Sequence, residues 1–195
     1  MHLHPAAGEP VAALVLGHGA NGRVNAPDLL RATEEANAHA VSVALVEQPY
    51  SVAGRRSPAP PNQLDAAWIA VIEHLQGGEH AGLPLIAGGR SMGARVACRT
   101  AAATRAIGVL CLAFPVHPPG RPEKSRLEEL DAVEVPTLVV QGTRDTFGMP
   151  PPAPGREVVQ VDGDHGLKKD LDAVGAAVAD WLGRVTRSPR APAGT

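Results

Sequence analysis

Short apolar runs alternate with longer amphipathic stretches along nearly the whole chain, and this alternation limits the folds open to it. The runs contain β-branched residues and are apolar at successive positions, which is typical of strands buried on both faces. The stretches between them have apolar residues at helical spacing. The pattern predicts an α/β fold with a mostly parallel central sheet flanked by helices. The expected strands are 11–16, 41–46, 84–88, 107–114, 137–141 and 157–162. The expected helices are 26–40, 62–76, 92–104 and 167–185.

The periodic elements indicate one domain. The chain has 195 residues, enough for a single sizeable core, and we expect the domain to cover residues 10–185. Residues 1–9 and 186–195 are expected to be flexible termini. Proline and glycine are frequent in 49–62, which is therefore expected to be a loop. The segment 115–136 between two expected strands is too short for an inserted cap domain.

Composition excludes several classes of partner. Hydrophobic residues make up 44% of the chain and charged residues 19%, with a net charge of −2. Basic residues are scattered and aromatic residues are only 3%, so we expect no nucleic-acid surface. No apolar run approaches the length of a membrane span, and the N-terminus has no signal-peptide pattern, so a cytoplasmic protein without a membrane partner is expected. Its oligomeric state stays open.

Metal and cofactor signatures are missing from the sequence. The two cysteines, Cys98 and Cys111, lie in apolar runs without the spacing of metal ligands, and we expect both to be buried thiols. The glycine-rich stretch 17–22 follows an expected strand, but it lacks the spacing of a dinucleotide fingerprint. We therefore expect neither a metal nor a cofactor.

The strongest chemical motif surrounds Ser91, which lies in a Gly-x-Ser-x-Gly frame between an expected strand and an expected helix. In this frame the serine occupies a tight, strained turn that exposes its hydroxyl at the end of the strand. Gly89 and Gly93 are expected where a side chain would collide with a neighbouring element. A serine that only happens to fall among glycines is the alternative. The strand before it and the helix after it favour a nucleophile.

A serine nucleophile needs a base, and the base needs an acid that orients it. Asp145 and His165 follow Ser91 in the chain order Ser-Asp-His, each just beyond an expected strand. Because the carboxyl ends of parallel strands meet at one edge, all three should converge there. Asp162 and Asp164 are closer to His165 in sequence and are expected to shape its turn.

An oxyanion hole would need two backbone N–H donors. Met92, directly after the serine, is one candidate. Ala20, in the loop after the first expected strand, is the other. The roles of Arg90 and His117 stay open.

These residues resemble the α/β-hydrolase superfamily. More narrowly, they are similar to the hydrolase-like family of testis-expressed protein 30 and the third subunit of the NSL histone-acetyltransferase complex, whose bacterial members are often labelled dienelactone-hydrolase-like. The motifs that carry the resemblance are "HGAN" (18–21), "GGRSMGAR" (88–95), "FPVHPPGRPEK" (114–124), "QGTRDTFG" (141–148) and "GDHGLK" (163–168). The resemblance implies Ser91, Asp145 and His165 as the triad, Ala20 and Met92 as the oxyanion hole, and a core without a cap. The leading antiparallel strands usual in this fold are expected to be missing or minimal.

Together, these expectations describe a serine hydrolase that cleaves small carboxylic esters or thioesters through an acyl-enzyme on Ser91. Its partner would be a small acyl substrate. A serine in place of aspartate disfavours haloalkane and epoxide chemistry, and a serine in place of cysteine differs from true dienelactone hydrolases. The second hypothesis is a hydrolase-like binding or assembly module with little or no activity, because one fold can serve unrelated functions.

Overall fold

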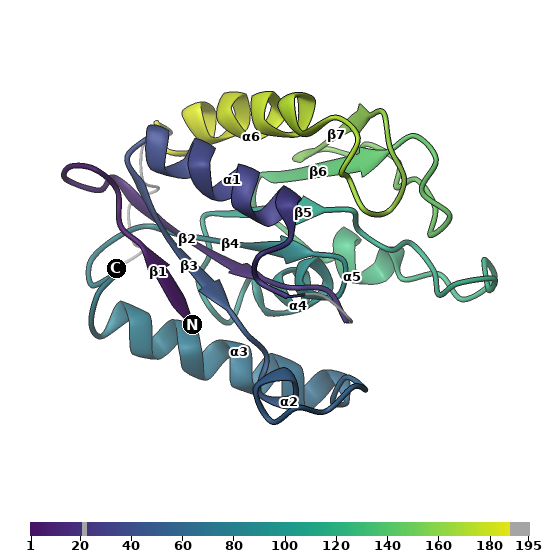
Figure 1. Cartoon of the computed structure of the whole chain (residues 1–195), viewed down its shortest axis with the longest axis horizontal. Coiled ribbons are helices and arrows are strands. Elements are labelled where there is room, and N and C mark those ends of the chain that lie inside the picture. The colour runs from purple at the N-terminus through teal and green to yellow at the C-terminus, as the bar shows by residue number, and fades with distance from the viewer. Residues whose placement is uncertain (21–22, 188–195) are drawn as a thin grey trace.

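A central sheet forms the middle layer of the computed structural model, which describes residues 1–20 and 23–187 (Figure 1). Within these residues the sheet has seven strands in the order β1-β3-β2-β4-β5-β6-β7. All neighbouring pairs are parallel except β1 and β3. The strands are β1 (His2–His4), β2 (Ala12–Gly17), β3 (Val41–Val46), β4 (Leu85–Arg90), β5 (Gly108–Leu112), β6 (Thr137–Gly142) and β7 (Arg156–Val161).

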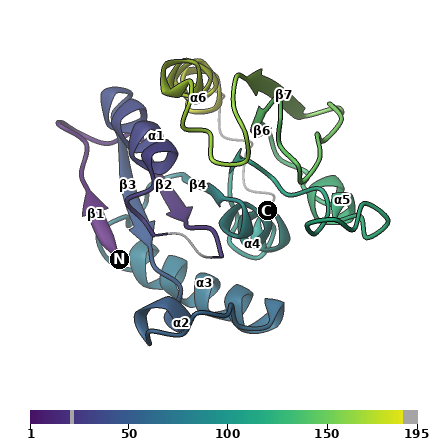
Figure 2. The same cartoon turned by 45° about the vertical axis from the view of Figure 1, so that its right-hand side comes forward.

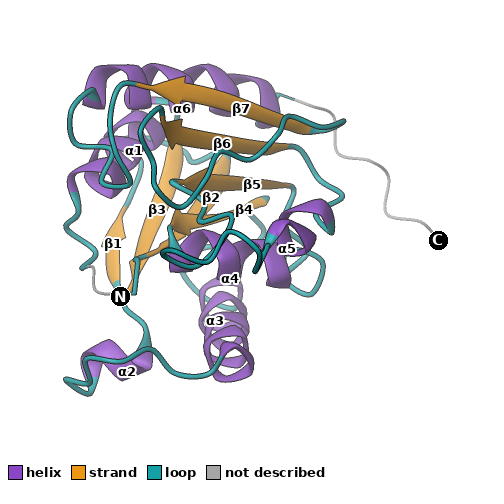
Figure 3. Ribbon diagram, turned by 90° about the vertical axis from the view of Figure 1, so that its right-hand side faces the viewer, coloured by secondary structure: helices purple, strands orange, loops and turns teal. Residues whose placement is uncertain are grey.

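Helices cover both faces of this sheet (Figures 2 and 3). Helices α1 and α6 pack together on one face, and α3 and α4 pack together on the other, with α5 against α4. The helices are α1 (Pro27–Ala38), α2 (Pro49–Val52), α3 (Pro61–Gln76), α4 (Met92–Thr100), α5 (Leu127–Asp131) and α6 (Leu171–Val185).

Each central strand contributes to two apolar cores. In β2, Leu14 and Leu16 belong to the core beneath α1 and α6, whereas Val15 belongs to the core beneath α3 and α4. Because successive side chains of a strand point to opposite faces, a sheet covered on both sides needs apolar residues at every position. This arrangement confirms the interpretation of the continuous apolar runs as buried parallel strands.

All six expected strands and all four expected helices are present, with shifted ends. The largest shifts are of four residues: α4, expected to reach residue 104, ends at Thr100, and the last helix, expected from residue 167, begins at Leu171. Asp170 precedes it and accepts a hydrogen bond from the Ala173 N–H, so the helix is capped four residues later than its apolar spacing indicated. Residues 49–52, expected in a loop, form the short helix α2.

The N-terminus differs from the expected flexible segment. Residues 2–4 form β1 and pair with Val43, Ala44 and Leu45 of β3, so the chain keeps one minimal antiparallel edge strand. Three residues are too few to show a periodicity in the sequence. Their pairing also depends on a partner strand that is distant in sequence. Of the expected C-terminal tail, residues 188–195 lie outside the described part of the chain.

The described part of the chain contains no cap domain. Within the described residues, the segment between β5 and β6 contains one short helix, α5. None of the helices in the described ranges is both long and apolar enough to cross a membrane.

Candidate active site

Ser91, Asp145 and His165 meet at one edge of the sheet. They follow β4, β6 and β7 respectively, so the carboxyl ends of three parallel strands bring them together. The Ser91 Oγ atom lies 2.9 Å from His165 Nε2, and His165 Nδ1 lies 2.8 Å from an Asp145 carboxylate oxygen. When the neutral ring donates from Nδ1 to Asp145, Nε2 is left to accept the Ser91 hydroxyl proton.

Ser91 occupies a strained turn between β4 and α4. Its backbone has φ 52° and ψ −108°, a conformation that residues with a side chain rarely adopt. The turn is possible because glycines surround it. A Cβ atom on Gly89 would lie 2.5 Å from the Gly17 carbonyl oxygen, and one on Gly93 would lie closer still to the same atom. The collision expected from the sequence is therefore with β2.

The Asp145 carboxylate is fully buried and held by three donors. Oδ2 accepts from His165 Nδ1 and, at 2.8 Å, from Gln141 Nε2, while Oδ1 accepts from the Phe147 N–H at 2.8 Å. Hydrogen bonds to an ionised group are stronger than neutral ones and fix its orientation. The oxygen that faces His165 is thereby held in place.

The imidazole of His165 is packed on one side and its backbone is anchored. The Phe147 ring stacks on the imidazole with ring centroids 4.1 Å apart, and the His165 side chain is 20% exposed. Arg90 Nη2 donates to the His165 carbonyl oxygen at 2.7 Å, and Arg90 Nε lies 2.8 Å from the buried carboxylate of Asp28 in α1. Arg90 thus connects α1 to the histidine loop.

Burial dominates the electrostatics of Asp28. Its side chain has no exposure to solvent, and removal from water raises the pKa of the carboxyl above its ordinary value of 3.8. The charge and hydrogen bond of Arg90, together with the Leu29 N–H, oppose this rise. The ion pair therefore offsets part of the cost of a buried charge.

Ala20, in the loop after β2, lines the same cleft as Ser91. Among the described residues, neither the Ala20 nor the Met92 backbone N–H donates a hydrogen bond. The Tyr50 hydroxyl donates to the Ala20 carbonyl oxygen at 2.8 Å. The buried His18 ring accepts from the Gln48 N–H at 3.1 Å and contacts the Gly19 carbonyl oxygen at 2.7 Å. The segment after β3 therefore braces this loop.

The competing residues have other hydrogen-bond or ion-pair partners. Asp162 is exposed and pairs with Arg144 and Lys169. Asp164 accepts from the Gly166 N–H and so shapes the turn after His165, as expected. His117 bonds to the Pro118 carbonyl oxygen and does not line the cleft.

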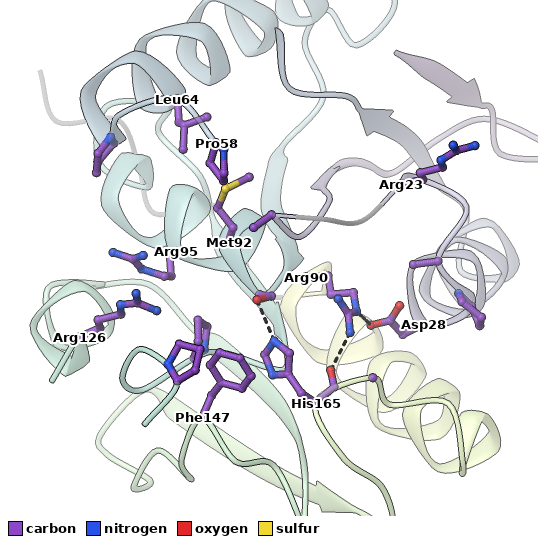
Figure 4. A pocket seen from close by; sticks show the side chains of 18 of the residues that line it. Arg23, Asp28, Pro58, Leu64, Arg90, Met92, Arg95, Arg126, Phe147 and His165 are labelled. Atoms are coloured by element: carbon purple, nitrogen blue, oxygen red, sulfur yellow. Dashed lines mark hydrogen bonds and ion pairs between the residues drawn. The ribbon is translucent and has the colours of Figure 1, made fainter. Parts of the chain in front are cut away.

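Ser91 and His165 open into a cleft of about 820 Å³. One part of its wall is apolar and includes Pro58, Ala59 and Leu64. Another part carries guanidinium groups, and those of Arg95 and Arg126 lie near each other in Figure 4. Across the described residues, no three histidine, cysteine, aspartate or glutamate side chains are grouped to hold a metal ion.

Several supporting residues were not identified from the sequence, namely Gln141, Phe147, Tyr50 and Asp28. Gln141 carried a usable signal, because a fully buried amide in the apolar run "TLVVQ" needs a hydrogen-bond partner. Asp28 was indistinguishable from an ordinary acidic residue in the first turn of a helix, and its partner Arg90 lies on a distant element. Phe147 and Tyr50 gave no signal, since a single aromatic residue in a loop is uninformative.

Known proteins resemble this chain in sequence pattern and in fold. The sequence model of one family, described as an alpha/beta hydrolase domain, matches residues 10–185. A serine hydrolase without a lid from Xanthomonas campestris is 19% identical with a TM-score of 0.75, covering 97% of this chain and 88% of its own. Est1E from Butyrivibrio proteoclasticus is 15% identical with a TM-score of 0.73, covering 94% and 92%. A dienelactone hydrolase from Anabaena variabilis is 16% identical with a TM-score of 0.70, covering 92% and 88%.

Proposed function

Because the chain belongs to the alpha/beta hydrolase domain family, we propose that it is a serine hydrolase that cleaves small carboxylic esters or thioesters through an acyl-enzyme. The observation that carries the proposal is the unbroken hydrogen-bond chain Ser91–His165–Asp145, with distances of 2.9 and 2.8 Å. Structural neighbours described as a serine hydrolase and as a dienelactone hydrolase support hydrolysis as the reaction class.

The proposed reaction begins when Ser91 Oγ attacks the substrate carbonyl carbon while His165 Nε2 takes the hydroxyl proton. Asp145 stabilises the imidazolium that forms and keeps Nδ1 protonated. The N–H groups of Met92 and Ala20 donate to the oxyanion of the tetrahedral intermediate. His165 then protonates the leaving alcohol or thiol, and water repeats the sequence to release the acid.

The strain at Ser91 fits this role. A backbone held at positive φ exposes the hydroxyl above the sheet edge and places the N-terminus of α4 directly behind it. Partial positive charge at that end of the helix favours the developing negative oxygen.

Active-site labelling with a fluorophosphonate tests the proposal. The wild type should be labelled at Ser91, and the Ser91→Ala variant should not be labelled. Ser125→Ala, which removes an exposed serine hydroxyl outside the cleft, is the matched control and should react like the wild type. Absence of labelling in a folded wild-type protein would favour the binding or assembly module instead.

A further inference from the structure

Positive charge gathers in the cleft that holds Ser91. Six cationic side chains line it: Arg23, Arg90, Arg95, Arg99, Arg126 and Lys168. Among the described residues that line it, the one acidic residue is Asp28, which is already paired with Arg90. A neutral ester requires no such excess of cations.

Two of these arginines are held by carboxylates from neighbouring elements. Arg95 binds Glu129 of α5 through two hydrogen bonds of 2.7 and 2.5 Å. Arg99 binds Asp65 of α3 at 2.9 and 2.6 Å and also reaches Glu129 at 3.2 Å. The Glu129 carboxylate therefore accepts hydrogen bonds from two guanidinium groups.

Arg126 differs from both. Its guanidinium has no ion pair or hydrogen bond with the described residues, although its side chain is half-buried at the cleft. Its backbone N–H donates to the Val116 carbonyl oxygen at 2.7 Å, so the proline-rich loop after β5 closes on itself and holds Arg126 at the cleft wall. Burial and the like charge of Arg95 lower the pKa of Arg126 from its usual value, and Arg99 adds to this effect while Glu129 opposes it.

The charges of this group do not balance. Arg95, Arg99 and Arg126 supply three positive charges, while Glu129 and Asp65 supply two negative charges. One positive charge therefore has no compensating negative charge within this group. A cation that lies beside like charges at a partly desolvated wall is unfavourable unless an anion binds there and neutralises it.

We propose that Arg126, with Arg95 beside it, binds a carboxylate of the substrate, so that the preferred substrates are esters or thioesters carrying a second, ionised carboxyl group. This inference rests on the proposed function and names its substrate class. A planar guanidinium fork matches the two oxygens of a carboxylate. Within the group of Arg95, Arg99 and Arg126, the one excess positive charge equals the single negative charge of a carboxylate.

Paired substrates test the proposal. The first pair is mono-4-nitrophenyl glutarate, whose acyl group carries a carboxylate, and the neutral 4-nitrophenyl butyrate. The second pair is 4-acetoxybenzoate, whose leaving group carries a carboxylate, and the neutral 4-acetoxybenzamide. The wild type should prefer the charged member of one pair by about tenfold in kcat/KM, which corresponds to about 1.4 kcal/mol. Arg126→Gln should remove that preference while changing kcat/KM for the neutral member by less than about twofold. Arg121→Gln, an exposed residue of the same loop outside the cleft, should keep the preference.

A binding measurement separates this proposal from the proposed reaction. Glutarate should raise the melting temperature of Ser91→Ala and should raise it much less for Ser91→Ala/Arg126→Gln. This readout requires no turnover, so it judges the anion site even if no ester is hydrolysed.

Three results would overturn the proposal. One is an equal loss on charged and neutral esters in Arg126→Gln. Another is a wild type that prefers the charged member of neither pair. The third is glutarate stabilisation that survives the loss of Arg126, or that is exceeded by inorganic phosphate at the same concentration.

Discussion

Ser91, His165 and Asp145 form one connected unit, so each substitution should remove most of the activity by itself. Ser91→Ala or His165→Ala is expected to lower kcat for 4-nitrophenyl butyrate by about 10⁴–10⁶-fold without changing the fold. Esterase assays with circular dichroism melts check this. Asp162→Asn is the control, because that exposed carboxylate pairs with Arg144 and Lys169 away from His165, and it should remain active.

Gln141 is a positioning residue for Asp145. Its Nε2 group donates to Asp145 Oδ2 and also reaches the carbonyl oxygens of Phe114 and Gly148. Gln141→Leu leaves a buried carboxylate with one donor fewer, so we expect a loss of about 1–3 kcal/mol in stability. Asp145 would also orient His165 less well, and kcat should fall about tenfold with little change in KM. Urea unfolding and steady-state kinetics measure the two effects, and unchanged values would assign Gln141 no role.

At the scale of elements, β2 and α4 approach so closely that only glycine fits between them. A Cβ atom on Gly93 would overlap the Gly17 carbonyl group, and backbone cannot move aside as a flexible side chain can. We expect Gly93→Ala to cost more than about 3 kcal/mol or to prevent folding. Gly8→Ala is the matched control, because a Cβ there meets no atom within 4 Å. Equal denaturation midpoints for the two variants would contradict the packing argument.

Arg90 joins three elements, and its loss should produce a pH-dependent instability. Arg90→Gln leaves the buried Asp28 without its cation, at an expected cost of about 3–5 kcal/mol near pH 7. Arg90 opposes the raised pKa of Asp28, so the pKa rises further in the variant. Above about pH 4 the unfolded chain has released this proton while the folded variant retains it, so stability falls as pH rises towards the folded pKa.

The size of this effect is measurable by urea unfolding at two pH values. The destabilisation by Arg90→Gln should be smaller at pH 5 than at pH 7.5, with a slope of up to about 1.4 kcal/mol per pH unit. The double variant Asp28→Asn/Arg90→Gln has no buried acid and should lose this dependence. A cost that is the same at both pH values would show that Asp28 is not the titrating group.

The whole molecule is a sheet between two helical layers with an open cleft at one edge. Among the described residues, only α5 interrupts the path from β5 to β6, so no inserted domain covers Ser91. We expect 4-nitrophenyl acetate and butyrate to be hydrolysed, with kcat/KM falling sharply for long acyl chains and no activation at a lipid interface. A higher kcat/KM for the palmitate than for the butyrate would reveal an acyl tunnel.

The sequence by itself determined the layered fold and the three convergent residues. Strands that are apolar on both faces need helices on both faces, and parallel strands bring their carboxyl ends to one edge. Ser91, Asp145 and His165 each lie within four residues of the end of such a strand, so their meeting could be predicted without distances. The glycines around Ser91 were equally predictable, because a strained turn has a local chemical requirement. The narrower resemblance to the family of testis-expressed protein 30 stays a prediction.

Only the tertiary structure decided which side chains support and surround the site. Two ion pairs join residues that are far apart in the chain, Asp28 with Arg90 and Asp65 with Arg99. Both pairs depend on how the helices pack against the sheet and against one another. The same packing leaves the Arg126 guanidinium without an ion pair or hydrogen bond among the described residues. Periodicity and turn chemistry depend on residues that are close in sequence. The partner of a buried charge can be distant in sequence, so only the tertiary structure identifies it. The substrate preference that we propose therefore arises at the level of the folded molecule.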